Sequence, residues 1–253
     1  MDKLIFNPLA TLREQAVVRQ AIVHELSNVA TVGFKRSFET ALRSLKFERD
    51  GFDTRYQAQA LYSDRIDLKP GALMATGRPL DVAMVGTTVL TVQAADGQPA
   101  YTRRGDLRVN AAGQVETGSG ALVLGEAGPL SVPAGFDITI TIDGQVLARD
   151  PGQVGVAAPA VVGRLRLRDA AETPLSRRED GLFQVAGQPP GTELPAGAGT
   201  VAVQPRALEG SNVGAVDAMT RMIDHARSFE TQIRVIKEMK ELDASGASMM
   251  RQG

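Results

Sequence analysis

Two histidines are the residues of this chain that are best suited to proton transfer or metal binding near neutral pH. His24 and His225 lie in the two terminal segments, and a site would require them to meet with a carboxylate such as Glu25 or Asp224. The chain has no cysteine, which excludes thiolate nucleophiles, iron–sulfur clusters and cysteine zinc sites. Two histidines without cysteine make a poor metal site. We therefore expect both to be surface or interface residues, with no metal and no cofactor.

The acidic residues of the middle of the chain raise the question of glycoside hydrolysis, which needs two carboxyl groups at a set separation. The sequence does not pair any two of the candidates. No Walker motif, no strand-linked Gly-x-Gly-x-x-Gly and no Gly-x-Ser-x-Gly is present either. An enzyme or a polysaccharide-binding β domain with helical appendages remains an alternative, but a protein that is not an enzyme is favoured. The carboxylate candidates are Asp81, Asp106, Glu116 and Asp137.

Three arginines alternate with leucines at Arg164, Arg166 and Arg168, which places them on one face of a predicted strand. Such a face can be solvated, where it discourages edge pairing, or it can contact acidic residues of a neighbouring subunit. Asp143-Gly144 and residues 110–113 resemble parts of calcium loops. Turn chemistry explains both, because Asp, Asn and Gly are the common turn residues.

Charge and hydropathy exclude several classes of partner. The formal net charge is −1 and both signs are spread along the 253 residues, so no electrostatic footprint for nucleic acid or anionic lipid is present. No stretch approaches the roughly 18 apolar residues of a membrane span. The N-terminal residues lack a basic region that leads into an apolar run, and we expect no cleavable signal peptide and no membrane insertion.

The N-terminal segment has the periodicity of an α-helix from Leu9 to about Val32, with apolar residues three and four positions apart. Its apolar stripe is wide, which indicates more than one packing partner. We expect Gly33 to end the helix in the left-handed conformation, with Phe34 folded back on Val29. The stripe consists of Leu9, Leu12, Ala16, Val23, Leu26 and Ala30.

The C-terminal segment after Pro205 has a stronger, heptad periodicity. One seam position holds Met219, Ala226 and Ile233, and the other holds Met222, Phe229 and Ile236. Val216, Ile223 and Met239 widen this seam. About 30 helical residues would span roughly 45 Å.

Between these helices the pattern changes to short alternating runs separated by glycine, which is typical of antiparallel strands. The clearest is Ile138–Ile142, followed by Asp143-Gly144 and Gln145–Leu147, a two-residue hairpin in which both turn residues have positive φ. The other predicted strands are Asp81–Val85, Thr88–Gln93, Ala100–Val109, Gln114–Thr117, Ala121–Leu124, Arg164–Arg168 and Gly181–Val185.

The sequence therefore predicts an α+β fold. The expected divisions are a terminal helical domain (1–34 with 208–253), a connecting region without assigned structure (35–76) and a central all-β domain (77–207). We expect the two long terminal helices to pair as an antiparallel or splayed, coiled-coil-like layer, because each apolar stripe needs a partner. Isolated helices gain little stability without packing, so we further hypothesise that they become fully ordered only when neighbouring subunits cover them.

Residues 24–35 resemble a motif of the axial proteins of the bacterial flagellum, Asn-Asn-Leu-Ala-Asn-x-x-Thr-x-Gly-Phe-Lys. The chain matches it at Leu26, Asn28, Thr31, Gly33, Phe34 and Lys35, and departs from it at His24, Glu25 and Ser27. Further similarity lies at Pro79–Ala83, Tyr101–Gly105, Asn110–Val115 and Leu208–Val213, followed by the helix from Met219 to Phe229. These motifs occur in the family's order and cover nearly the whole chain.

Within this family, the start Met1–Phe6, the short length and the segments Gly125–Leu130 and Val162–Leu165 most resemble proximal-rod members. Distal-rod or hook-type subunits are the alternative within the family. The resemblance implies a periplasmic rod subunit in the basal body, exported by the flagellar type III apparatus and assembled with proximal and distal rod proteins to transmit torque. The residues expected at subunit contacts are Leu9, Leu12, Ala16, Val23, Leu26, Asn28, Thr31, Gly33, Phe34, Val216, Met219, Met222, Ile223, Ala226, Phe229, Ile233 and Ile236.

Overall fold

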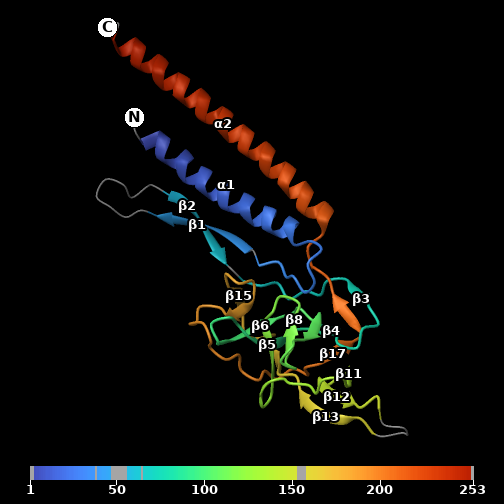
Figure 1. Cartoon of the computed structure of the whole chain (residues 1–253). Helices are drawn as coiled ribbons and strands as arrows, with labels where there is room; N and C mark the ends of the chain where they lie inside the picture. The colour runs from blue at the N-terminus through green and yellow to red at the C-terminus, as the bar shows by residue number, and fades with distance from the viewer. Residues whose placement is uncertain (1–2, 38, 47–55, 64, 153–157, 252–253) are drawn as a thin grey trace. The chain divides into compact units, whose positions relative to one another are not determined.

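Two long helices formed by the terminal segments are the largest elements of the fold (Figure 1). The computed structural model describes residues 3–37, 39–46, 56–63, 65–152 and 158–251. Helix α1 spans Lys3–Ser27, and helix α2 spans Ala215–Arg251, 37 residues. Apolar periodicity predicted both helices, and the α+β class is confirmed. The bounds differ, because α1 ends at Ser27 and not at Val32.

Tertiary contacts, not a C-cap, fix the chain after α1. Residues 28–30 form turns, and Gly33 has the predicted positive φ, +68°. The Gly33 N–H donates to the carbonyl oxygen of Glu209 at 2.7 Å, so Gly33 belongs to a loop that packs on a distant strand. The predicted helix end at Gly33 was therefore wrong, although the expected backbone conformation of this glycine was right.

The chain divides into two compact units. The helical unit consists of the described residues within 1–27, 40–62 and 214–253, and the β unit consists of those within 28–39 and 63–213. In the helical unit α1 and α2 lie side by side and run in opposite directions (Figure 1), and strands β1 (Glu39–Lys46) and β2 (Tyr56–Ser63) form a two-stranded sheet. The region that the sequence left unassigned thus contributes to both units.

The largest sheet of the β unit has nine strands among the described residues, in the order β15-β16-β6-β5-β9-β8-β7, with β10 paired to β9 and β14 paired to β5. The pairs are antiparallel, as the alternating pattern predicted. The strands are β5 (Thr88–Gln93), β6 (Pro99–Thr102), β7 (Leu107–Val109), β8 (Val115–Thr117), β9 (Leu122–Gly125), β10 (Gly128–Pro129), β14 (Leu167–Asp169), β15 (Leu175–Arg177) and β16 (Phe183–Val185).

Smaller antiparallel sheets complete the β unit. Three strands form the sheet β11-β12-β13, while β4 pairs with β17 and β3 pairs with β18. The last pair brings the segment before the β core and the segment that leads to α2 together. These strands are β3 (Leu73–Ala75), β4 (Val82–Met84), β11 (Asp137–Ile140), β12 (Gln145–Arg149), β13 (Ala160–Arg164), β17 (Val203–Pro205) and β18 (Ala207–Glu209).

Strand β5 is central to the core because both of its faces are buried. Leu90 and Val92 point into the larger apolar cluster, while Val89 lies in a second cluster with Tyr101 and Phe183, as the two-residue period of a strand requires. Burial of each such side chain contributes about 1.5–3 kcal/mol. The pattern of Thr88–Gln93 predicted this strand with its observed bounds.

Two predicted strands are broken in the structure. Ala100–Val109 divides into β6 and β7 because the side chain of Arg103 is fully buried and Gly105 packs against β4, where a Cβ atom would lie 1.7 Å from the carbonyl oxygen of Val82. Arg164–Arg168 divides at Leu165, which makes an isolated bridge to Gly125. Close packing therefore interrupts patterns that looked continuous.

The arginines consequently do not share one strand face. Arg164 pairs with Asp143 at 2.9 Å, Arg166 pairs with Glu193 at 2.9 Å, and Arg168 donates to the carbonyl oxygen of Leu167 at 3.0 Å. The predicted uniform arginine face was wrong, because Arg164 ends β13 and Arg168 lies in β14, and these strands belong to two different sheets.

The β11–β12 hairpin is confirmed, but its turn differs from the predicted one. The N–H of Gly144 donates to the carbonyl oxygen of Thr141 at 3.0 Å, and Gly144 has φ +79°, whereas Asp143 is not among the described residues with positive φ. Only the glycine supplies the left-handed conformation. The Asp143 carboxylate instead accepts hydrogen bonds from Thr141 and Gln145 and pairs with Arg164.

The carboxylate of Asp169 binds residues of separate loops, and its contribution to the free energy of unfolding should depend on pH. Its carboxylate accepts hydrogen bonds from the Thr87 hydroxyl and from the N–H groups of Ala171 and Gly199, at 3.1 and 3.0 Å for the latter two. The Thr87 hydrogen bond is the main cause that lowers the pKa of this carboxyl. Because the folded-state pKa lies below the unfolded-state value, the stabilisation is complete above the unfolded pKa and is lost as the pH falls through the folded pKa.

We expect Asp169→Asn to lower the free energy of unfolding by about 1.5–3 kcal/mol at pH 7, since the lost hydrogen bonds are made to a charged group. The difference from the unmodified protein should shrink as the pH drops below the unfolded pKa of about 3.9. Urea titrations at several pH values measure it. A difference that is the same at pH 7 and pH 3 would contradict this account.

Candidate assembly site

The helix pair is the first part of the candidate site, and two polar contacts show which faces meet. The Arg221 guanidinium pairs with the Glu25 carboxylate at 2.6 Å, and His225 Nε2 lies 2.8 Å from the carbonyl oxygen of Gln15. The partner number falls from 25 to 15 as the α2 number rises, which agrees with the antiparallel arrangement. Ala218 and Met222 share this face of α2 through their three- and four-residue spacing.

Glu25 is almost completely buried, with 4% of its side chain exposed, and its pairing with Arg221 offsets the cost of removing a carboxylate from water. Arg221 also contacts Asp217 one turn earlier, at 3.0 Å. Glu25 is one of the positions at which the chain departs from the family motif. In this chain the residue forms an ion pair between the two helices.

The histidines make no metal site in the described part of the chain. His225 is bound to backbone, and His24 lies on the exposed surface of α1. Among the described residues no group of three or more potential ligands from His, Cys, Asp and Glu is present. Both histidines are residues of the helix pair.

The helix contact divides the predicted heptad seam. Met222, Ile233 and Ile236 are half-buried, and Ala218, which was not predicted, is fully buried. On the adjacent stripe of α2, Val216, Met219 and Ile223 are 78%, 52% and 54% exposed. Ala226 is exposed too, and Phe229, 38% exposed, lies at the border of the two stripes. We call Val216, Met219, Ile223 and Ala226 the open stripe.

Helix α1 shows the same division. Ile22 is buried and Leu26 is half-buried, whereas Ala16 is exposed and Val23 is 47% exposed. Leu9 and Leu12 belong to α1, but their side chains lie outside the described ones. Apolar surface on both helices is therefore left uncovered by the chain itself.

Of the predicted contact residues, Asn28, Thr31, Gly33 and Phe34 belong to the β unit and make their described contacts within it. The Thr31 hydroxyl donates to Asn28 Oδ1 at 3.1 Å. Gly33 lies so close to the backbone of Arg103 that a Cβ atom would meet it at 2.5 Å, and the Phe34 ring lies 4.5 Å below the guanidinium of Arg177. Gly33 and Phe34 are buried by contacts within the chain.

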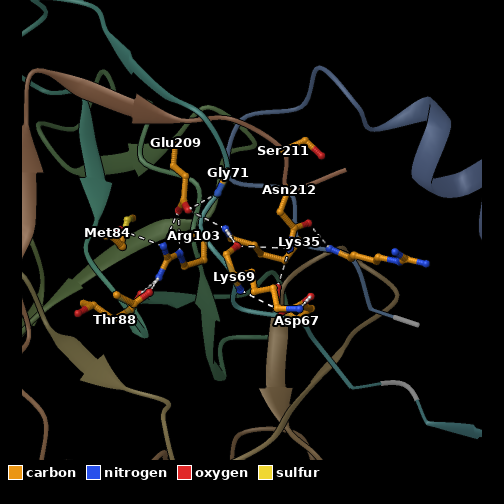
Figure 2. Close-up of polar contacts among 12 residues, drawn as sticks. Lys35, Asp67, Lys69, Gly71, Met84, Thr88, Arg103, Glu209, Ser211 and Asn212 are labelled. Atoms are coloured by element: carbon orange, nitrogen blue, oxygen red, sulfur yellow. Dashed lines mark hydrogen bonds and ion pairs between the residues drawn. The ribbon is translucent and has the colours of Figure 1, made fainter. Parts of the chain in front are cut away.

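A buried ionic cluster, which the sequence reasoning missed, anchors this loop (Figure 2). Glu209 Oε1 accepts a hydrogen bond from Lys35 Nζ at 2.7 Å, and Glu209 Oε2 lies 2.7 Å from Arg103 Nη2. The side chains of Lys35 and Arg103 are completely buried, and that of Glu209 is 3% exposed. We call these three residues the ionic cluster.

Backbone carbonyls complete the ionic cluster, because two cations and one anion leave a net charge of +1. Arg103 donates to the carbonyl oxygens of Met84, Gly86 and Thr88 at 2.9, 2.6 and 2.8 Å. Lys35 Nζ donates to the carbonyl oxygen of Lys69 at 2.7 Å. Burial lowers the pKa of both Lys35 and Arg103, and their contact with Glu209 opposes that effect.

A signal for this cluster was present in the sequence. Each member lies in one of the recognised motifs, Lys35 at the end of 24–35, Arg103 within Tyr101–Gly105 and Glu209 within Leu208–Val213. Nothing in the local patterns showed that these three motifs converge, since Glu209 lies 106 residues after Arg103 and 174 after Lys35. Only the tertiary structure could reveal the cluster.

The acidic residues considered for catalysis do not form a working pair in the described structure. Asp106 pairs with Arg104 at 2.7 Å, Glu116 pairs with Arg108 at 2.7 Å, and Asp137 is exposed on β11. Asp81 is buried next to Arg78, at 3.7 Å. Asp81 and Asp106 are partners in an isolated backbone bridge, but the Asp106 carboxylate is taken up by Arg104, and the buried Asp81 carboxylate accepts no hydrogen bond in the described structure. No helix in the described part of the chain combines the length and apolar character that crossing a bilayer requires.

Two protein-family models match the regions that carry this architecture. Residues 83–148 match the model described as flagellar hook protein FlgE/F/G D1 domain, and residues 204–249 match the model described as flagellar basal body rod FlgEFG protein C-terminal. A β unit between paired terminal helices, together with these matches, defines the axial proteins of the bacterial flagellum as the class.

Similarity over the full chain is more specific. The sequence is 39% identical to the flagellar basal-body rod protein FlgF of Escherichia coli K12 over 248 residues, 95% of either chain. It is 39% identical to FlgF of Salmonella typhimurium LT2 over 249 residues, again 95% of either chain, and 30% identical to FlgG of Agrobacterium fabrum over 244 residues, 88% of this chain and 90% of that protein. The chain belongs to the flagellar basal-body rod protein family, in its FlgF branch.

The function follows from this membership. The chain is a structural subunit of the flagellar basal-body rod, serves motility and is not an enzyme. The class of protein that the motifs predicted is thus confirmed. As a rod protein, the chain assembles with other rod subunits.

Proposed function

We propose that this rod subunit belongs to the proximal rod and assembles through its terminal helices, which pack against those of neighbouring subunits to form a shaft that transmits torque. The open stripe on α2 is the observation that carries this proposal, because the intramolecular partner α1 leaves it exposed. A row of apolar side chains on one helix face favours burial against another helix.

The neighbours in this proposal are proximal and distal rod proteins, with the flagellar type III apparatus as the route of export into the periplasmic space. Similarity to FlgF proteins supports the proximal position, and similarity to a FlgG protein supports a shared mode of packing between different rod subunits. A tagged copy imaged at the distal end of the rod or in the hook would favour the distal-rod or hook-type alternative.

The predicted contact residues take different places in this proposal. The open stripe with Ala16 and Val23 contacts neighbours, Met222, Leu26, Ile233 and Ile236 hold the helix pair, and Phe229 contributes to both. Gly33 and Phe34 hold the loop after α1 against Glu209 and Arg177 of the β unit, and Asn28 and Thr31 brace the turn within this loop. Leu9 and Leu12 are proposed contact residues on the grounds of their helical spacing alone.

The proposal includes coupling between assembly and helix order, since uncovered helices gain little stability without packing. We expect the circular dichroism at 222 nm to show more helix per residue in polymerised protein than in dilute monomer. The matched reference is a shortened chain of residues 28–213, which keeps Lys35, Glu209 and Asn212 and should show almost no helical signal. A full-length protein that is fully helical and strictly monomeric at high concentration would overturn the coupling.

A further inference from the structure

The chain passes between the helical unit and the β unit four times, at 27/28, 39/40, 62/63 and 213/214. On the β-unit side, these passages are made by residues 28–39, by the segment that begins at 63 and by the segment that ends at 213. The helical unit is therefore joined to the β unit through three segments that are far apart in the sequence.

The side chain of Asn212 joins these three segments (Figure 2). Its Oδ1 accepts a hydrogen bond from the N–H of Arg36 at 2.7 Å, and its Nδ2 donates to the carbonyl oxygen of Asp67 at 2.8 Å and, more weakly, to that of Lys69 at 3.4 Å. The Asp67 N–H donates to the carbonyl oxygen of Arg36 at 2.7 Å. A ring of hydrogen bonds thus links residues 36, 67 and 212.

An asparagine suits this position because its amide donates and accepts through atoms of one short side chain. The orientation of the amide is set by its surroundings, since the Arg36 N–H needs an acceptor and the Asp67 carbonyl needs a donor. The segment is held on its other side by the backbone, where the Asn212 N–H donates to the carbonyl oxygen of Phe34 at 3.2 Å.

We propose that Asn212 is a positioning residue that makes the three segments share a mechanical force, so that torque on a terminal helix does not peel one segment from the β unit. Without its amide, a pull on residue 214 acts on the backbone hydrogen bond from Asn212 to Phe34, on the β18–β3 pair and on the ion pairs of Glu209. With it, the pull also reaches the segments of Arg36 and Asp67 directly from residue 212, before it reaches Glu209. The inference rests on the proposed torque-transmitting function, but it concerns the single subunit.

The test is single-molecule force spectroscopy on the full chain, which has no cysteine of its own, so handles attach only to introduced cysteines. Gly214→Cys and Glu172→Cys, both at exposed positions, apply the force across the C-terminal passage. We expect Asn212→Ala to shorten the lifetime of the closed state at constant force about tenfold or more, since two good hydrogen bonds are lost. Asn212→Asp keeps an acceptor for the Arg36 N–H but loses the donor to the Asp67 carbonyl oxygen. We expect it to shorten this lifetime less than Asn212→Ala does.

Two controls separate force sharing from general destabilisation. Asn110→Ala removes an amide that accepts from Ala112 and Gln114 within one turn, and it should leave the lifetime nearly unchanged. Handles at Glu172→Cys and Ala112→Cys, both exposed in the β unit, pull across no passage, and with them Asn212→Ala should behave like the unmodified chain.

Hydrogen exchange supplies an independent measurement on the unstretched monomer. We expect the Arg36 amide to exchange at least tenfold faster in Asn212→Ala, while amides of β5 keep their protection. Equal lifetimes of Asn212→Ala and the unmodified chain across the passage, or an equal loss with both handle pairs, would overturn the inference. Neither measurement needs assembly, so a failure of the proposed rod contacts would be seen separately, as a loss of polymerisation.

Discussion

Glu209→Gln is expected to lower the free energy of unfolding of the β unit by about 3–5 kcal/mol, the cost of removing one partner from a buried ion pair. Glutamine keeps the size of the side chain but removes the only carboxylate of the ionic cluster, leaving the buried cations Lys35 and Arg103 without a counter-charge. The glutamine side chain has one acceptor oxygen where glutamate has two, and this neutral oxygen accepts hydrogen bonds more weakly than a carboxylate oxygen does. The hydrogen bond of 3.0 Å that the Gly71 N–H donates to Glu209 Oε1 should become weaker in this variant as well.

Urea unfolding followed by fluorescence of the tyrosines or by circular dichroism of the strands measures this effect. Glu126→Gln is the matched control. Glu126 is 65% exposed, and its carboxylate lies 3.8 Å from the guanidinium of Arg164. A loose surface pair of this kind contributes about 0–1 kcal/mol. Lys35→Met should cost less than Glu209→Gln, since it leaves one cation and one anion buried together. A loss below about 1 kcal/mol for Glu209→Gln would contradict the assigned role of the ionic cluster.

Ile223→Glu is expected to abolish assembly into the rod and swimming, while the stability of the isolated subunit stays within about 0.5 kcal/mol. Ile223 is 54% exposed on the open stripe, so the charge meets water in the monomer. Once a neighbouring helix covers this position, an unpaired carboxylate would be buried, at a cost of several kcal/mol, or more than a hundredfold in the association constant. Met219→Glu should act in the same way.

Thr231→Glu provides the matched control, because Thr231 is exposed on the same helix and lies outside the open stripe, about 80° around the helix axis from Ile223. Polymerisation of purified protein by light scattering and swimming in soft agar measure both variants. Ile223→Glu assembly at the level of Thr231→Glu would show that the open stripe is not a subunit contact. Met222 is a poorer position for this test, since a charge there would also disturb the pair with α1.

The existence of both terminal helices could be predicted, because an apolar stripe of three- and four-residue spacing has no other regular explanation over more than 20 residues. Their ends could not. Residues up to Val32 continue the helical pattern of α1, yet the chain leaves the helix at Ser27 because Gly33 is held by Glu209 and Phe34 by Arg177. These contacts outweigh the small local preference for another turn of helix.

The β unit shows the same limit. Thr88–Gln93 was predicted with its observed bounds because it is a short run rich in β-branched and apolar residues, which suits a strand buried on both faces. Strands β1 and β2 in the unassigned region were not recognised. Glu39–Lys46 has no clear alternation, and the alternation at the start of Tyr56–Ser63 rests on alanine and glutamine, of which alanine is depleted in strands. The break at Arg103 was invisible because a buried arginine looks, in sequence, like a solvated one.

The sequence by itself determined the class of protein and the order helix, β unit, helix, because periodicity and turn residues are local properties and the family motifs are written in the chain. Only the tertiary structure decided which half of the α2 seam stays open, since that depends on where α1 lies. The tertiary structure also brought Lys35, Arg103 and Glu209 together. It placed the Asn212 amide within hydrogen-bonding distance of the segments that contain Arg36 and Asp67. A charge or an amide is stable inside the fold only through partners that are distant in sequence, and no local pattern records them.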